Sequence, residues 1–153
     1  MSYVARVLQP GETVVHVTGL HWFLYLPAIG LAIVAIALAI LSTQLDPNAA
    51  LAAQIGAALF AVLALASWLG ALLRRRTTEL AVTDRRVIFK RGLVRRHTIE
   101  MNLAKVESVN VDQSIGGRLF NYGTVTIRGT GGGLDPLRNI EGPLAFRNHV
   151  TAA

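Results

Sequence analysis

The segment WFLYLPAIGLAIVAIALAILST, residues Trp22 to Thr43, contains no charged side chain. A helix rises about 1.5 Å per residue, so a segment of this length extends roughly 33 Å and can cross a hydrocarbon core of about 30 Å. A second apolar segment runs from Ala49 to Leu73, after the turn-forming sequence Asp-Pro-Asn at 46–48. The sequence therefore predicts two membrane-spanning helices joined by a short loop.

Two other interpretations fit the apolar segments less well. A pair of buried helices in a soluble core would need a covering shell, and the 80 residues that follow the second segment are too few to provide one. A cleaved signal peptide would carry a basic segment next to a shorter apolar run, whereas this run begins only at residue 22 and is long.

The distribution of charge indicates the orientation of the predicted helices. Fourteen of the fifteen Lys and Arg residues lie in residues 74–153, and the net charge of the chain is +6. The triplet Arg74–Arg76 directly follows the second apolar segment, whereas the loop contains no Lys or Arg. By the positive-inside rule, we expect the loop outside and both termini in the cytoplasm.

The predicted organisation has five segments. They are an N-terminal cytoplasmic segment with a possible strand (1–21), a first transmembrane helix (22–43), an external loop (44–50), a second transmembrane helix (51–73) and a cytoplasmic domain (74–153).

Small residues spaced four apart predict where the two helices approach each other. The candidate packing residues are Ala28, Ala32, Ala35, Ala39, Ala53, Ala57 and Ala61. Neither span contains an ionisable residue, which argues against an ion or proton pathway through this hairpin alone.

Beyond the arginine triplet, the hydrophobic pattern changes to an alternation of apolar and polar residues. Residues 79–83 and 86–90 flank Asp84 and Arg85, which predicts a β-hairpin with a two-residue turn. The cross-strand pairs expected from this turn are Val82 with Val87, Leu80 with Phe89, and Glu79 with Lys90.

Short strands and loops continue to the end of the chain. We expect further strands at Glu12–Thr18, Val94–Met101, Val106–Val111 and Thr124–Arg128, loops at 116–117, 121–123 and 129–133, and a closing helix at Pro143–Val150. Many short strands with one terminal helix favour a mainly-β domain of bent antiparallel sheets, or a partly open barrel, with a C-terminal helix.

Four segments together resemble one known family. They are VLQPGE (7–12), TELAVTDRRVIFKRGLVRR (78–96), EMNLAKVESV (100–109) and DQSIGGRLFNYGTVTIRGTGG (112–132). This order of motifs is similar to the bacterial pleckstrin-homology-like (PH-like) family of membrane proteins, which implies a location in the bacterial inner membrane. The resemblance implies two near-orthogonal sheets capped by a C-terminal helix. It implies no catalytic motif, and likeness of fold does not transfer phosphoinositide binding.

A cluster of cations follows the second apolar segment and is the strongest functional feature of the sequence. The candidate lipid-headgroup contacts are Arg74, Arg75, Arg76, Arg85, Arg86, Lys90, Arg91, Arg95 and Arg96. Cations near the inner leaflet each gain on the order of 1 kcal/mol from anionic lipid. The alternatives are topology signals on a solvated surface, or a discrete headgroup pocket. Nucleic acid is not an expected partner, because a membrane-apposed basic face meets lipid phosphate first.

A glycine-rich run offers a second candidate site. The amides of Gly129, Thr130, Gly131, Gly132 and Gly133 could form an anion-binding nest. The run lacks the Gly-Lys-Ser/Thr of a phosphate-binding loop, and a flexible connection between strands is the alternative.

No other group of residues has the spacing of a reactive site. The chain has no cysteine, and its four histidines have neither metal-ligand spacing nor a carboxylate cluster. We therefore expect no catalytic residue, metal or cofactor. The predicted function is a non-enzymatic scaffold or accessory subunit of a membrane complex, with membrane lipids and other membrane proteins or further copies as partners. The alternative is an anionic-lipid headgroup-binding module.

Overall fold

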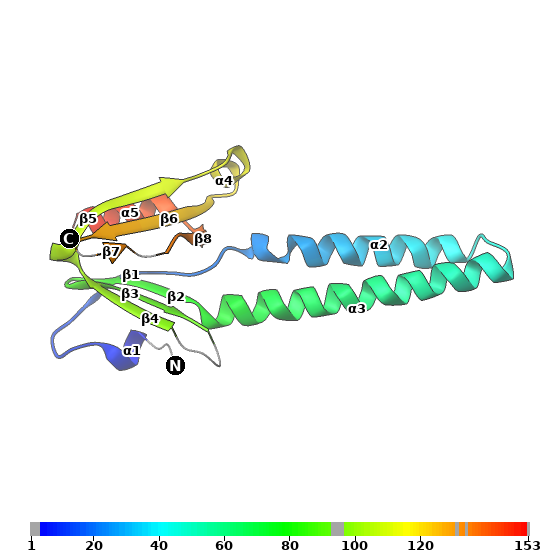
Figure 1. Ribbon diagram of the computed structural model, residues 1–153, viewed down its shortest axis with the longest axis horizontal. Helices are drawn as coiled ribbons and strands as arrows, with labels where there is room; N and C mark the ends of the chain where they lie inside the picture. The colour runs from blue at the N-terminus through cyan, green and yellow to red at the C-terminus, as the bar shows by residue number, and fades with distance from the viewer. Residues whose placement is uncertain (1–3, 93–96, 131, 134, 153) are drawn as a thin grey trace. The chain divides into compact units, whose positions relative to one another are not determined.

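The computed structural model describes residues 4–92, 97–130, 132–133 and 135–152 (Figure 1). The chain forms two compact units, one from residues 1–21 with 74–153 and one from residues 22–73. We refer to them as the β unit and the helical hairpin. The segments before and after the hairpin, which were separate in the predicted organisation, thus belong to one folded unit.

The helical hairpin consists of a short 3-10 turn, η1 (Trp22–Tyr25), and the helices α2 (Leu26–Ser42) and α3 (Pro47–Thr77). The loop between α2 and α3 is shorter than the predicted 44–50. Asp46 explains the early start of α3, because its side chain accepts a hydrogen bond from the Ala49 amide at 3.1 Å and Pro47 occupies the first turn. At its other end, α3 continues through the arginine triplet to Thr77.

The packing stripe of the hairpin has a period of seven residues. The buried small residues are Ala28, Ala35 and Ser42 on α2 and Ala57, Ala64 and Ala71 on α3. Of the predicted packing residues, Ala32 and Ala53 are only partly buried and Ala39 and Ala61 are exposed. The four-residue spacing was therefore wrong for the exposed Ala39 and Ala61, whereas a packing role of the partly buried Ala32 and Ala53 stays a prediction. A seven-residue repeat is typical of helices that pack at a shallow angle, because it keeps the same side chains facing the partner.

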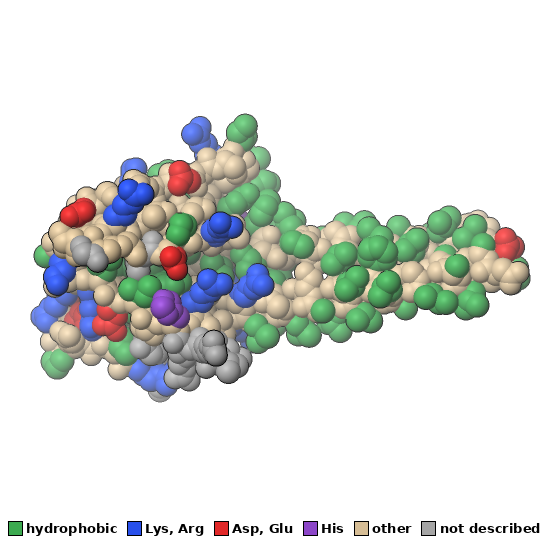
Figure 2. Space-filling model, in the orientation of Figure 1, with side chains coloured by type: hydrophobic (Ala, Val, Ile, Leu, Met, Phe, Trp, Pro, Cys, Tyr) green, Lys and Arg blue, Asp and Glu red, His purple; other side chains and the backbone are tan. Residues whose placement is uncertain are grey.

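The outer surface of the hairpin is apolar. Ile33, Ile36, Ile55 and Val62 each expose 60% or more of their surface, and hydrophobic side chains cover both helices in Figure 2. The segments Trp22–Ser42, which joins η1 to α2, and Pro47–Thr77 are long and apolar enough to cross a membrane, with mean hydropathies of 2.6 and 2.2. Only 11% and 6% of their most apolar stretches are buried. This exposure is unlike that of core helices in a soluble protein.

Enlarging the small stripe should separate the helices. Because Ala64 is 9% exposed, the variant Ala64→Leu is expected to lose about 1–3 kcal/mol of hairpin stability through overpacking. The measurement is the loss of helical circular dichroism on heating the full-length protein in a mild detergent. Ala66→Leu, two residues along on the exposed side, is the matched control. Equal melting of the two variants would contradict this packing.

The β unit contains two antiparallel sheets (Figure 1). Sheet A consists, in spatial order, of β1 (Val14–Thr18), β2 (Glu79–Thr83), β3 (Arg86–Arg91) and β4 (His97–Asn102). Sheet B consists of β5 (Val106–Asp112), β6 (Tyr122–Gly129) and β7 (Gly132–Gly133), and β8 (Leu137–Glu141) also pairs with β6. A 3-10 turn, η2 (Leu103–Lys105), connects β4 to β5, and the C-terminal helix α5 (Pro143–Thr151) packs on β5 and β6.

The predicted β2–β3 hairpin is confirmed in its register. Val82 lies opposite Val87, Leu80 opposite Phe89 and Glu79 opposite Lys90. The Thr83 hydroxyl fixes the turn, since it accepts hydrogen bonds from the amides of residues 85 and 86 at 3.2 and 3.0 Å.

The core lies between the two sheets and α5. Its buried residues are Leu80, Val82, Val87, Phe89, Val125, Ile127, Leu137, Ile140, Phe146 and Val150. Leu20 extends the first strand toward sheet B, where it forms a bridge with Ile140, so the residues just before the hairpin contribute to both sheets.

Several predicted elements change. The loops at 116–117 and 121–123 were wrong, because the short helix α4 (Ile115–Leu119) contains the first and β6 begins within the second. The strand β8 and the short helix α1 (Val4–Val7) were not predicted. For the strand predicted at 94–101, residues 94–96 lie outside the described residues, and β4 begins at His97.

Candidate functional site

The β unit has two opposite ends that differ in their residues. At one end the chain leaves for the hairpin after His21 and returns at Arg74, beside the paired residues Thr18 and Leu80. We refer to this as the exit end. The far end holds the Asp84–Arg85 turn, η2 and the end of α5.

The predicted cation cluster is divided between these ends. Arg74–Arg76 form the last turn of α3, and Lys90 and Arg91 finish β3 at the exit end. Arg85 and Arg86 lie at the far end, separated from Arg91 by the length of β3, roughly 16 Å. That separation exceeds the screening length of about 8 Å at physiological ionic strength. Arg95 and Arg96 lie outside the described residues.

Arg86 belongs to an ion-pair network inside the β unit. Its guanidinium contacts the Glu12 carboxylate at 2.7 Å and the Glu100 carboxylate at 2.6 Å, and it donates to the Val7 carbonyl at 2.8 Å. The hydrogen bonds from Arg86 lower the pKa of Glu12 from 4.5 to about 2. The Glu12 side chain is fully buried and also accepts from the Thr83 hydroxyl. Arg86 therefore holds the N-terminal segment on the β2–β3 turn, and its charge is already compensated.

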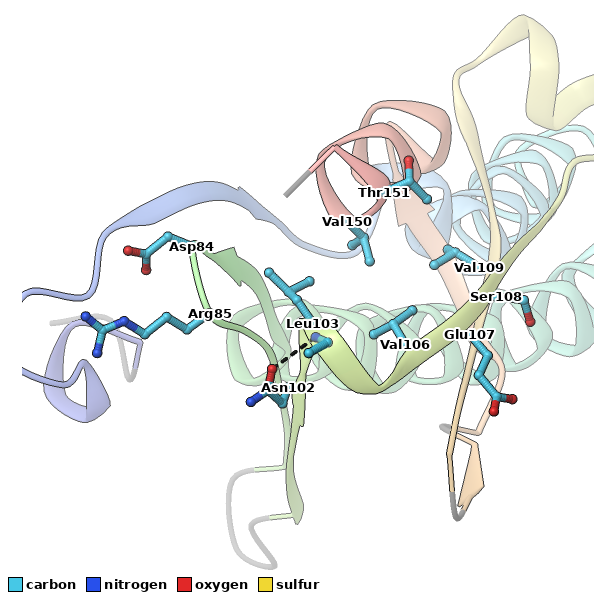
Figure 3. Close-up of a pocket in the computed structure, with 11 residues that line it drawn as sticks. Asp84, Arg85, Asn102, Leu103, Val106, Glu107, Ser108, Val109, Val150 and Thr151 are labelled. Carbon is cyan, nitrogen blue, oxygen red and sulfur yellow. Dashed lines mark hydrogen bonds between the residues drawn. The ribbon is translucent and has the colours of Figure 1, made fainter.

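A cleft of about 600 Å³ opens at the far end. It is lined by the β2–β3 turn, η2, the beginning of β5 and the end of α5. Figure 3 shows the apolar side chains Leu103, Val106 and Val150 directed toward one another, whereas Asp84, Arg85 and Glu107 point outward around them. An apolar floor with a rim of both charges suits a protein segment better than a phosphate group.

The described residues of the glycine-rich run lie at the same end, where β6 pairs with β7. Gly129 pairs with Gly132 and Arg128 pairs with Gly133, and the Thr130 amide donates to the Lys105 carbonyl at 3.0 Å. A Cβ on Gly129 would lie 2.5 Å from the Lys105 carbonyl oxygen. The close approach of the two backbones thus explains why residue 129 is a glycine. The nest stays a prediction, and Gly131 lies outside the described residues.

Two of the histidines form a stacked pair. The rings of His16 on β1 and His149 on α5 lie 4.6 Å apart. Burial lowers the pKa of His16, and the neighbouring His149 lowers it further. Among the residues that the structure describes, no three His, Cys, Asp or Glu side chains are grouped as metal ligands.

At the exit end, the structure has an exposed apolar surface that was not predicted from the sequence. Ile115 and Leu119 on α4 are 90% and 77% exposed. Glycines at 116 and 117 suggested a loop, whereas a helix would have placed these two apolar side chains on one face. Such a pattern over a single turn is too short to identify from sequence.

A mainly-β unit of two sheets capped by a C-terminal helix, interrupted by a long apolar helical hairpin, is the architecture expected for a PH-like domain with membrane helices. The family model of the bacterial PH domain matches residues 15–153. The chain belongs to this family. No curated protein and no solved structure matches the chain. Membership supports a module that binds protein or lipid.

Proposed function

We propose that this chain is a non-enzymatic protein of the bacterial inner membrane that binds a protein partner, as a scaffold or accessory subunit of a membrane complex. The observation that carries this proposal is the far-end cleft. Its apolar floor and mixed rim offer burial together with both signs of charge, and it lies at the end of the β unit opposite the two chain connections to the hairpin.

The apolar outer surface of the hairpin supports the membrane part of the proposal. Isoleucine and leucine side chains that are more than half exposed on both helices would be costly in water and are favourable in lipid. The arginine triplet ends α3, whereas the loop after α2 carries no cation. By the positive-inside rule, this asymmetry supports a cytoplasmic location for the β unit and both termini.

Contact with anionic lipid is a second candidate function, favoured by the cations at the exit end. Arg74–Arg76 adjoin the second span, and Lys90 and Arg91 end the neighbouring strand β3. Lys90 is also 4.0 Å from Glu79, which reduces the charge available for a headgroup. This arrangement supports general attraction to anionic lipid.

The test uses two positions on one strand. A photo-cross-linker is attached to a cysteine at Ser108, which lines the cleft, or at Asp112, at the exit end of β5, in full-length protein in native membranes. We expect one cross-linked protein of defined mass from residue 108 and not from residue 112.

A charge reversal on the cleft rim provides the control. Glu107→Arg is expected to reduce the cross-link from residue 108 at least tenfold, whereas Asp112→Arg, the same change at the other end of β5, leaves it in place. Cross-links to lipid alone, or equal effects of the two reversals, would contradict partner binding in the cleft.

A further inference from the structure

The exposed apolar surface of α4 is out of place on a solvated domain. Ile115 and Leu119 are four residues apart and therefore lie on the same side of the helix. Both expose most of their surface. Figure 2 shows hydrophobic side chains gathered over α4. Single exposed apolar residues are common on protein surfaces, but an adjoining pair this exposed indicates a contact surface.

The position of α4 is fixed by hydrogen bonds. The Ser114 hydroxyl caps the helix by accepting from the Gly117 amide at 3.1 Å. The Gln113 side-chain amide donates to the carbonyls of Gly117 at 3.2 Å and Tyr122 at 3.1 Å. The same backbone geometry that holds the helix also keeps its apolar side chains directed outward.

This surface lies next to the point where the chain enters the hairpin. The rings of His21 and Tyr122 stack at 5.3 Å, and a Cβ on Gly116 would lie 3.5 Å from the Tyr122 hydroxyl oxygen. One aromatic ring therefore separates the first turn of α4 from His21. The next residue, Trp22, begins the first apolar helix.

We propose that Ile115 and Leu119 insert into the interface of the bilayer that the hairpin spans, with Arg118 at the lipid phosphates. Apolar side chains on short amphipathic elements enter the boundary between headgroups and acyl chains to a depth of about 5–10 Å. Arg118 is exposed beside them, and a guanidinium can remain among phosphates while its stem lies in the apolar layer. This inference rests on the proposed membrane anchoring.

Insertion of α4 would give the β unit a third point of attachment. The two chain connections leave through β1 and β2, which are neighbouring strands of sheet A. A contact on sheet B, through the β5–β6 connection, would hold the unit at a defined tilt to the bilayer.

The experiment places an environment-sensitive fluorophore on single cysteines in full-length protein in nanodiscs of mixed zwitterionic and anionic lipid. The positions are Leu119 on α4, Glu107 at the far end as a water-exposed reference, and Ile36 on the outer surface of α2. The chain has no native cysteine, so each label is unique. We expect shorter-wavelength emission and reduced iodide quenching at residues 119 and 36, and neither change at residue 107.

A second set of variants tests the insertion with the label kept at one position, residue 118, in all of them. With the fluorophore at Arg118, the double change Ile115→Asp/Leu119→Asp should restore iodide quenching to the level at residue 107. Because both side chains are exposed, this change removes little packing, and circular dichroism checks that the fold is kept.

The outcomes separate this inference from the anchoring on which it depends. Shielding at residue 36 with full quenching at residue 119 would overturn the insertion of α4 and leave the anchoring intact. Full quenching at residues 36 and 119 would overturn both the insertion of α4 and the membrane anchoring. Shielding at residue 119 that appears only at high protein concentration would show that a second copy, rather than lipid, covers α4, and would also overturn the inference.

Discussion

Replacing Glu12 with Gln is expected to lower the free energy of unfolding of the β unit by about 3 kcal/mol, because it leaves a largely buried guanidinium without its main counter-charge. The side chains of Glu12 and Arg86 are 0% and 15% exposed. Hydrogen exchange of the β2 and β3 amides in full-length protein, in a mild detergent, measures this loss.

Two further variants establish that the pair is responsible. Glu107→Gln, a change of an exposed carboxylate on β5, should alter the free energy of unfolding by less than about 0.5 kcal/mol. The double variant Glu12→Gln/Arg86→Met should lose less than the sum of its single changes, because no unpaired charge remains. Additive losses would show that the two residues act independently.

The same carboxylate predicts a dependence of stability on pH. Its pKa is lowered on folding from 4.5 to about 2, so its contribution is present above the unfolded-state value. That contribution is lost as the pH falls from about 4.5 to about 2. The difference in stability between the native protein and Glu12→Gln should therefore shrink across this range. A difference that stays constant would mean that Glu12 does not titrate with folding.

Replacing Gly129 with Ala is expected to cost about 2–3 kcal/mol, because the new methyl group has no space. Its carbon would lie 2.5 Å from the Lys105 carbonyl oxygen and 2.9 Å from the Met101 sulfur. The first of these atoms belongs to the backbone and cannot rotate away. Hydrogen exchange of the β5 and β6 amides measures the effect in the full-length protein.

Thr130→Ala is the matched control, since it changes the adjacent exposed residue of the same run and keeps the backbone amide. This variant should leave the free energy of unfolding nearly unchanged. If the run instead binds an anion, Gly129→Ala should weaken phosphate binding at unaltered stability, and the steric explanation of Gly129 would be wrong.

Local patterns predicted the parts of the fold that depend on neighbours in sequence. Alternating residues on either side of Asp84 and Arg85 defined the β2–β3 hairpin to the exact pairing. The length of the apolar segments predicted both hairpin helices, but their ends depend on capping and on the helix propensity of the arginines. The buried small residues follow the seven-residue repeat of two packed helices. The motif of small residues four apart does not separate these buried positions from exposed ones.

Contacts between distant residues explain the features that local sequence patterns did not predict. Glu12 and Arg86 are separated by 74 positions, so no local pattern reveals that this arginine is already paired. Gly116 and Gly117 suggested a turn because glycine is a poor helix former. In the structure, Gly117 is needed because a Cβ there would lie 2.6 Å from the Tyr122 carbonyl oxygen.

Sheet A combines a strand made before the hairpin with strands made after it. β1 ends at Thr18, and its partner β2 begins only at Glu79, a delay of roughly 3–12 s at ~5–20 residues per second of synthesis. During that interval both apolar helices leave the ribosome while β1 has no strand to pair with. In the proposed topology, the hairpin should therefore enter the membrane before the β unit can fold. Every folded copy would then be an anchored copy, without a soluble folded precursor.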